Sequence, residues 1–249
     1  MMNKQALIQQ HHPDAIRKRL ATPNKPQYIS DAVLGGIDGC VTTFAVVAGV
    51  LGAGFSSSVA LILGMANLIA DGFSMAMSNY ESVRAQHEYN NRLRLIEAEH
   101  VQQVPDGERE EIRQLFQAKG FDGAILNHIV DTLTQNQDVW IDTMLTEEHG
   151  VQKTLSNPKQ SALTTFIAFI LVGIMPLLPF LSTSLAPQQQ FIFSAGIAAI
   201  MFFLVGMIKG IYVATPLFIS GLRTLLTGGA AATLAFLTGY LLREIFGIG

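Results

Sequence analysis

Five long apolar segments constrain the fold of this 249-residue chain more than any other feature. Each segment has 21 to 23 residues, and a helix of about 20 residues crosses the hydrocarbon core of a bilayer. Backbone polar groups in lipid must be satisfied within the segment, so these segments are predicted to be helices. The segments are Asp31–Ala53, Val59–Tyr80, Ser161–Leu181, Phe191–Tyr212 and Thr224–Phe246. The sequence therefore predicts an all-α integral membrane protein with five transmembrane helices.

The charged residues are segregated from these segments. The chain is 49% hydrophobic and 14% charged, whereas an average soluble domain has about 25% charged residues. Of the 19 acidic residues, 14 lie between Glu81 and Lys153. We therefore predict four regions: an N-terminal tail at 1–29, transmembrane helices 1 and 2 at 30–80, a polar helical insert at 81–157, and transmembrane helices 3–5 at 158–249.

The distribution of basic residues predicts the orientation. The connectors at 53–58 and 182–190 contain no Lys or Arg, and the insert contains seven basic residues. Cytoplasmic loops of membrane proteins carry an excess of Lys and Arg, so the tail and the insert are predicted to be cytoplasmic and the C-terminus to lie on the opposite side. The tail itself is interpreted as disordered and solvated, with contact to anionic lipid head groups as the alternative. Its basic residues include Arg17, Lys18, Arg19 and Lys25.

The insert has a helical pattern throughout. The second membrane helix is predicted to continue without a break until Pro105, and further helices are predicted at about 107–120, 122–134 and 138–149. These helices are expected to share a small apolar core. The predicted core residues are Leu93, Ile112, Leu115, Phe116, Ile125, Ile129, Leu133, Trp140 and Ile141.

Three aspartates, Asp31, Asp38 and Asp71, interrupt the apolar segments. An ionisable group at membrane depth costs at least a few kcal/mol and usually faces a bundle interior or a water-filled path. Asn67, Asp71 and Met75 are spaced at i, i+4 and i+8, so they form one stripe of oxygen and sulfur donors. Carboxylates suit hard and borderline divalent cations, and a thioether favours softer ones. The pattern indicates a path for a cation, although Met75 on its own is also typical of plain packing.

Glycines accompany the first two aspartates. Gly35, Gly36 and Gly39 lie between or beside Asp31 and Asp38. Small residues in membrane helices allow close approach of a neighbouring helix. We predict this packing role for the three glycines, whether or not the aspartates serve transport.

A second group of metal-ligand residues lies in the insert. Two pairs in this group are three residues apart, so each pair projects from one helix face. Facing Glu-x-x-His and Glu-x-x-Glu pairs build iron and manganese sites in helical bundles. The alternative is a solvated acidic face, which is the interpretation for the neighbouring Glu99, Glu110 and Glu147. The candidate ligands are Glu97, His100, Glu108, Glu111, Met144 and Glu148.

The chain resembles the vacuolar iron transporter family in SDAVLGGIDGCVTTFAVVAGV, in ADGFSMAMSNY, and in a Glu-rich insert that closes with WIDTML. The resemblance extends from about Tyr28 to the C-terminus, and its most specific parts are Asp38–Thr42 and Ser74–Met75. It implies a homodimer with five membrane helices per subunit and a cytoplasmic metal-binding domain after the second helix. It also implies export of ferrous iron, and in some members manganese, from the cytosol, in several cases in exchange for protons.

The resemblance also implies roles for individual residues. Asp38 and Met75 match the intramembrane metal path of the family. The translocation path is therefore predicted to consist of Asp38, Asn67, Asp71 and Met75, with Asp31 as an additional candidate. The matching ligands of the cytoplasmic domain are Glu97, Glu108, Glu111, Met144 and Glu148.

The chain departs from the family pattern at several positions. Asn67 stands where the family has a Glu, and Asp71 stands one turn later where the family has a small residue. Asn67 cannot exchange a proton, so Asp71 is expected to substitute for the missing Glu. His100 replaces a Glu and Leu145 replaces a common Met. An imidazole shifts the insert site toward borderline metals and makes its affinity sensitive to pH near neutrality.

These observations predict a homodimeric transporter that exports a divalent transition metal from the cytosol by metal/proton exchange. Ferrous iron is the first candidate for the bound and transported ion and manganese the second; no prosthetic group, catalytic residue or nucleic-acid partner is expected. The predicted location is the cell membrane of a bacterium or a vacuole-like membrane of a eukaryote. Two alternatives stay open: a membrane-tethered carboxylate-type iron oxidase, and a metal sensor that signals through its insert.

Overall fold

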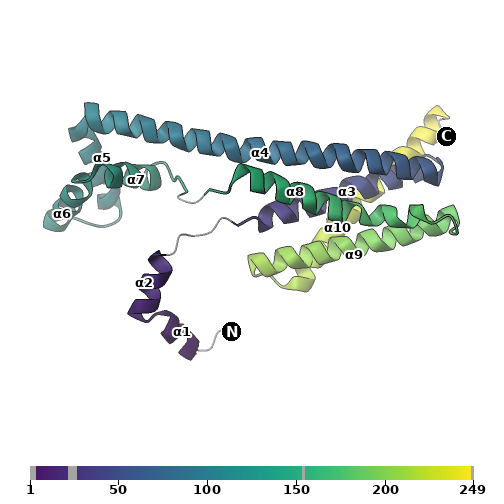
Figure 1. The fold of residues 1–249 in the computed structure, drawn as a ribbon, viewed down its shortest axis with the longest axis horizontal. Helices are drawn as coiled ribbons and strands as arrows, with labels where there is room; N and C mark the ends of the chain where they lie inside the picture. The colour runs from purple at the N-terminus through teal and green to yellow at the C-terminus, as the bar shows by residue number, and fades with distance from the viewer. Residues whose placement is uncertain (1–3, 22–26, 153–154, 248–249) are drawn as a thin grey trace.

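The computed structural model describes residues 4–21, 27–152 and 155–247, and every regular element in these ranges is a helix (Figure 1). In chain order the elements are α1 (Lys4–Gln10), α2 (Pro13–Ala21), α3 (Ile29–Gly52), α4 (Ser57–Gln103), α5 (Pro105–Ala118), α6 (Gly123–Thr134), α7 (Gln137–Glu147), α8 (Pro158–Gly173), the 3₁₀ helix η1 (Met175–Leu181), α9 (Pro187–Val213) and α10 (Leu217–Phe246).

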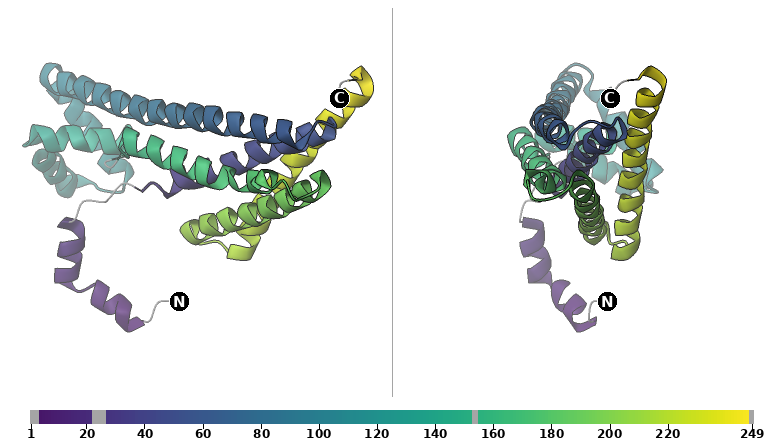
Figure 2. Two further views of the ribbon diagram at one scale, coloured as in Figure 1. Left: turned by 45° about the vertical axis from the view of Figure 1, so that its right-hand side comes forward. Right: turned by 90° about the vertical axis from the view of Figure 1, so that its right-hand side faces the viewer.

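The apolar helices form one bundle. Helices α3, α4, α9 and α10 are long and apolar enough to cross a membrane, and the bent pair α8–η1 is a fifth candidate. Seen along the long axis of the molecule, α3 lies among the other apolar helices (Figure 2), and it packs against α4, α8, α9 and α10. The predicted apolar segments are therefore the helices of this bundle.

The third predicted segment is not one continuous helix, and the prediction was wrong on this point. Helix α8 ends at Gly173, and η1 continues from Met175 at an angle of 41°. The run MPLLPF places Pro176 and Pro179 in η1. Proline has no backbone N–H and its ring clashes with the carbonyl group four residues earlier, so it breaks an α-helix.

Glycines allow α3 to touch the backbones of its neighbours, as predicted. A Cβ atom on Gly35 would lie 2.3 Å from the carbonyl oxygen of Thr165, and a Cβ atom on Gly39 would lie 2.4 Å from that of Phe169. At Gly36, an added Cβ atom would lie 3.3 Å from the side chain of Val172. Any side chain at Gly35 or Gly39 would push α8 away from α3.

Helix α4 joins the bundle to the insert. Its 47 residues continue without a break to Gln103, as predicted, and at 1.5 Å per residue they extend about 70 Å. A bilayer core needs only about 30 Å of this length. Helices α5, α6 and α7 gather at the distal end of α4, opposite the end of the molecule that carries the C-terminus (Figure 1).

The core of the insert differs from the prediction in α6, at Ile125 and at Ile129, which is only partly buried and lies outside the core cluster. Leu93, Ile112, Trp140 and Ile141 are buried as expected, but the side chain of Ile125 is 65% exposed. Helix α6 instead buries its 126, 130 and 134 positions, which follow one another at four-residue spacing and form a single face. The choice between adjacent apolar residues depended on the rotation of α6 about its own axis.

The N-terminal tail contains helix where a disordered segment was predicted. Helices α1 and α2 are short, and α2 has no buried residue. Its sequence begins with Pro and Asp, and Lys18 and Arg19 lie in its last turn. Both ends therefore suit the helix dipole. The prediction for Lys25 lies outside the described residues.

Candidate metal centre

Two helices meet at a turn that brings the predicted ligand pairs together. Glu97 and His100 lie in the last two turns of α4, and Glu108 and Glu111 lie in the first two turns of α5. The connection is short because Val104 ends α4 and Pro105 occupies the first turn of α5. Proline suits this position, where its missing N–H is not needed.

The side chains of this turn are in contact. Nδ1 of His100 lies 3.3 Å from Oε1 of Glu108. The pKa of Glu108 is raised to about 7, first by burial and then by the nearby charges of Glu111 and Glu97, while His100 opposes the shift. Two helix faces therefore share one electrostatic site, as the spacing predicted.

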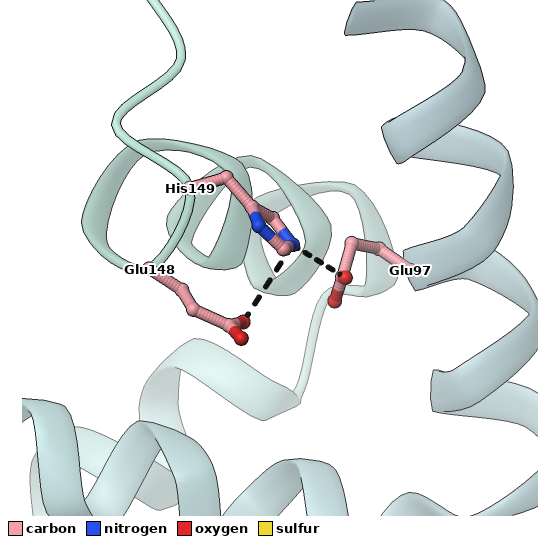
Figure 3. Close-up of side chains that lie close together, drawn as sticks. All are labelled: Glu97, Glu148 and His149. Carbon is pink, nitrogen blue, oxygen red and sulfur yellow. Dashed lines mark hydrogen bonds and ion pairs between the residues drawn. The ribbon is translucent and has the colours of Figure 1, made fainter. Parts of the chain in front are cut away.

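The last turn of the insert adds two more groups. Nε2 of His149 lies 2.9 Å from Oε1 of Glu97 and 3.7 Å from Oε2 of Glu148 (Figure 3). The pKa of Glu148 is raised, first by burial, and the charges of Glu111 and Glu97 contribute to the shift. The carboxylate cluster therefore extends from α4 and α5 to the end of α7.

Two of these carboxylates are buried with an oxygen atom that has no partner. The side chains of Glu97 and Glu108 are 3% and 2% exposed, and Oε2 of each accepts no hydrogen bond in the described structure. A buried charge without compensation costs several kcal/mol, so such groups are normally paired or coordinate a metal. The free oxygens provide acceptor positions suited to a cation.

The other two predicted ligands occupy different environments. Glu111 is exposed but interacts electrostatically with Glu108 and Glu148. Met144 is fully buried in the apolar core of the insert, one turn before Glu148. Glu99, Glu110 and Glu147 are exposed, as predicted, and Glu147 forms an ion pair with Lys119.

Sequence reasoning did not identify His149 as part of this cluster. Helix α7 ends at Glu147, so helical spacing does not predict the direction of a side chain two residues later. Gly150 adopts a left-handed backbone conformation, with φ of 65°, directly after His149. The only signal in the sequence was the position of a histidine directly beside the predicted ligand Glu148.

The intramembrane aspartates lie between α3 and its neighbours. Asp38 and Asp71 are both half-buried and lie close enough for their charges to interact. In the part of the chain that the structure describes, neither carboxylate has a hydrogen bond or ion pair. Asp38 also lines a cavity of about 400 Å³ with Lys209 and Tyr212. Two apposed carboxylates without partners form a second site suited to a cation.

Asn67 and Met75 lie one turn before and one turn after Asp71 on α4. The Nδ2 atom of Asn67 is buried without a hydrogen-bond partner among the described residues. Met75 is partly buried and packs against the apolar core of the bundle. The burial of Met75 agrees with a packing role as well as with a role in the path.

Asp31 has a different environment from the other two aspartates. Asn79 donates hydrogen bonds through Nδ2 to Oδ1 of Asp31 at 3.1 Å and to Oγ1 of Thr165 at 2.8 Å. These bonds connect α3, α4 and α8 beside the point where α4 leaves the bundle. Asp31 therefore has a structural partner that Asp38 and Asp71 lack.

The helical bundle, its half-buried aspartates and the carboxylate cluster define the class of this protein: an integral membrane protein equipped to handle cations. A sequence profile of the VIT family matches residues 29–240. The chain belongs to the VIT family.

Similar proteins cover most of the chain. It is 31% identical over 229 residues to vacuolar iron transporter 1 of Oryza sativa subsp. japonica, covering 91% of this chain and 87% of the rice protein. It is 30% identical over 235 residues to a vacuolar iron transporter of Toxoplasma gondii, covering 91% of this chain and 78% of that protein. It is 30% identical over 215 residues to vacuolar iron transporter 1 of Arabidopsis thaliana, covering 84% of each chain.

Proposed function

We propose that this protein exports a divalent transition metal from the cytosol, with ferrous iron as the first cargo and manganese as the second. The observation that carries the proposal is the position of two cation-suited sites on one helix. Helix α4 holds Asp71 opposite Asp38 in the bundle and Glu97 in the carboxylate cluster at its far end. The names of the similar proteins from rice, Toxoplasma and Arabidopsis support iron as the cargo.

In the proposed mechanism the insert captures the ion. Glu97 and Glu108 offer buried oxygens without partners, and His100 adds an imidazole nitrogen beside them. Mixed oxygen and nitrogen donors suit iron, manganese, cobalt and zinc better than calcium. The remaining members of the capture site are Glu111, Met144 and Glu148.

The ion then passes through the bundle. Asp38 and Asp71 hold it by charge, while Asn67 and Met75 add an amide oxygen and a thioether along the same face of α4. A carboxylate must be deprotonated to bind a cation, so entry of the metal expels any proton that it carries. Proton exchange at Asp38 and Asp71 thereby couples metal export to a pH gradient. The path is proposed to lie at the interface of a homodimer.

Transport into vesicles tests this function. The purified protein would be reconstituted into liposomes that contain a metal-sensitive dye, and Fe²⁺, Mn²⁺, Zn²⁺ and Co²⁺ would be offered with and without an imposed pH gradient. We expect a dye signal with Fe²⁺ and a smaller one with Mn²⁺, both faster with the gradient. Protein-free liposomes are the control.

The same experiment separates the alternatives. The iron oxidase would consume Fe²⁺ outside the vesicles without a signal inside, and the sensor would produce neither change. A flux equal to that of protein-free liposomes for all four metals would contradict the proposed function.

A further inference from the structure

We propose that α1 and α2 form a peripheral anchor that lies on the bilayer surface beside the bundle and binds anionic phospholipid. The surface that covers these two helices is the head-group layer and upper acyl region of the membrane that the bundle crosses. The inference goes beyond the proposed function, because it requires only that the bundle spans a membrane and does not depend on the transported ion.

The side chains of α2 are arranged as an interfacial helix requires. Ile16 and Leu20 are four residues apart and therefore share one face of the helix. Arg17 and Arg19 flank that face on its two sides, whereas Asp14 lies on the far side of the helix. Arginine beside an apolar stripe can bury its aliphatic stem and keep its charge among the head groups. A basic amphipathic helix of this kind is typical of a membrane surface.

The apolar side chains of the tail are uncovered. Helix α2 has no buried residue, and the side chain of Leu20 is 77% exposed. In α1, Ile8 is 63% exposed and Leu7 is also exposed. Both helices lie outside the bundle in the two views of Figure 2. Transfer of these side chains from water to the acyl boundary of a bilayer is favourable.

The chain holds α2 close to the membrane surface. Tyr212, in the last turn of α9, donates a hydrogen bond from its hydroxyl group to Oε1 of Gln27. Tyrosine at the end of a membrane helix is typical of the membrane–water interface. Ala21 ends α2 six residues before Gln27, and six residues span at most about 21 Å. Figure 1 shows α2 near the end of the bundle that faces the insert. In the proposed topology this end faces the cytoplasmic leaflet, which carries the anionic lipids.

The acidic insert is the other surface that could attract a basic tail, but it is less suited. Many of its acids already have basic partners within the insert, and its apolar core is built from its own helices and the end of α4. Among the described residues, neither Arg17 nor Arg19 forms an ion pair with an acid. A lipid surface offers an anionic layer and an apolar layer side by side, which match both kinds of side chain in the tail. The ion pairs within the insert include Arg94–Asp142, Arg109–Asp131, Arg113–Glu110 and Lys119–Glu147.

The depth of a fluorescent label on α2 tests the proposal. Full-length Leu20→Cys would be labelled with an environment-sensitive maleimide and reconstituted into phosphatidylcholine liposomes, with or without about 30% phosphatidylglycerol. Both liposomes would contain a lipid with a spin-label quencher near the top of its acyl chain. We expect at least about twofold stronger quenching with phosphatidylglycerol, and loss of most of this difference in 1 M NaCl, which screens charges beyond about 3 Å. The natural Cys40 is fully buried, and the wild-type protein measures its background labelling.

Two controls separate membrane binding from other causes. A label on Asp14→Cys, on the far side of α2, should be quenched weakly in both liposomes. Arg17→Gln with Arg19→Gln, made in the labelled Leu20→Cys protein, should abolish the effect of phosphatidylglycerol, because glutamine is also a good helix former but has no charge. Arg92→Gln with Arg113→Gln removes two positive charges from the insert and should leave the effect unchanged.

The same measurements define the results that would overturn the proposal. Weak quenching of the Leu20→Cys label in both liposomes would show that α2 does not lie on the bilayer. If that label were also shielded from a water-soluble quencher at low salt and released in 1 M NaCl, the tail would bind the acidic insert instead. Equal quenching with and without phosphatidylglycerol would show that anionic lipid is not the ligand.

Discussion

At the scale of single residues, burial distinguishes two candidate metal ligands of the insert from the solvated acids around them. The insert contains many exposed acids, including Glu99 and Glu110, yet Glu97 and Glu108 are buried and each has an oxygen without a partner. In the bundle, Asp31 is satisfied by Asn79, while Asp38 lines a cavity. Environment therefore assigns different roles to residues of the same type.

The first prediction concerns Asp38. We expect Asp38→Asn to reduce metal flux into vesicles to the level of protein-free liposomes while the protein stays folded, because the variant removes a charge from an apolar helix and adds none. Flux of Fe²⁺ and the elution volume in detergent are the measurements. Asp122→Asn, at the start of α6, is the control. Wild-type flux in Asp38→Asn would exclude Asp38 from the path.

The second prediction concerns proton coupling at Asp71. Asp71→Asn should abolish the acceleration of flux by a pH gradient, since an amide cannot exchange the proton that a carboxylate loses to a metal. Asn67 lies about 5.4 Å, one turn, earlier on the same face. The double variant Asn67→Glu with Asp71→Gly should therefore restore part of the coupling. If the Asp71→Asn variant kept the full acceleration of flux by a pH gradient, proton exchange would be assigned to Asp31 or Asp38 instead.

The third prediction concerns pH and Glu108. Its pKa rises from 4.5 to about 7, so the folded state holds the proton more tightly than the unfolded state. Protonation of Glu108 therefore stabilises the metal-free fold. This stabilisation is fully present below about pH 4.5 and is lost as the pH rises through about 7. Metal binding must displace the proton, so affinity for Co²⁺ should increase by up to about tenfold per pH unit below pH 7.

Titration calorimetry at several pH values measures this dependence. Glu108→Gln should weaken binding and flatten the pH profile. Glu110→Gln, an exposed neighbour on the same helix, should behave like the wild type. If the Glu108→Gln variant had the same pH profile as the wild type, the pH dependence of Co²⁺ affinity would be assigned to the histidines instead.

At the scale of elements, α4 both connects and separates the two candidate sites. Glu97 follows Asp71 by 26 residues on one unbroken helix, which places them about 39 Å apart along its axis. One ion cannot be bound by both at once. In the proposed mechanism, the capture site and the path would therefore act in sequence, with release of the ion between them.

The packing of α3 on α8 gives a fourth prediction. Gly39→Ala should destabilise the protein by about 1–3 kcal/mol, because the new Cβ atom would lie 2.4 Å from the backbone oxygen of Phe169 and the helices must move apart. Thermal unfolding in detergent is the measurement. Gly196→Ala, on α9, is the matched control, since an added Cβ atom there meets nothing within 4 Å. Equal unfolding temperatures for the two variants would show that α3 and α8 can separate without cost.

At the scale of the whole molecule, the insert and the C-terminus lie at opposite ends (Figure 1). The loop between η1 and α9 has no basic residue, and the insert has seven. The alternation of charged and uncharged connectors agrees with this arrangement. In the proposed transport cycle, the end with the insert would collect the metal and the opposite end would release it.

Labelling of single cysteines tests this orientation as the fifth prediction. His128→Cys in α6 and Thr183→Cys in the loop after η1 are both exposed positions, whereas the natural Cys40 is fully buried. In sealed vesicles of one orientation, a membrane-impermeant maleimide should label His128→Cys from the cytoplasmic side and Thr183→Cys only from the opposite side. Labelling of both variants from the same side would contradict the predicted topology.

The sequence by itself determined the helical segmentation and the spacing of the ligand pairs. The apolar segments, the unbroken α4 and the pairing of Glu97 with His100 follow from local hydropathy and helical periodicity. These properties do not depend on how the helices meet. The residues of the first two membrane segments likewise indicate the family, because the resemblance is carried by short runs of neighbouring residues.

Only the tertiary structure decided which groups come together across the fold. His149 reaches Glu97 because the chain turns at Gly150 after α7 has ended. Asp31 reaches Asn79 of α4 where glycines bring α3 against α8 and where Asn79 also bonds to Thr165 of α8. The exposure of Ile125 depended on the rotation of α6. Each of these outcomes depends on packing between residues distant in the chain, which local periodicity does not specify.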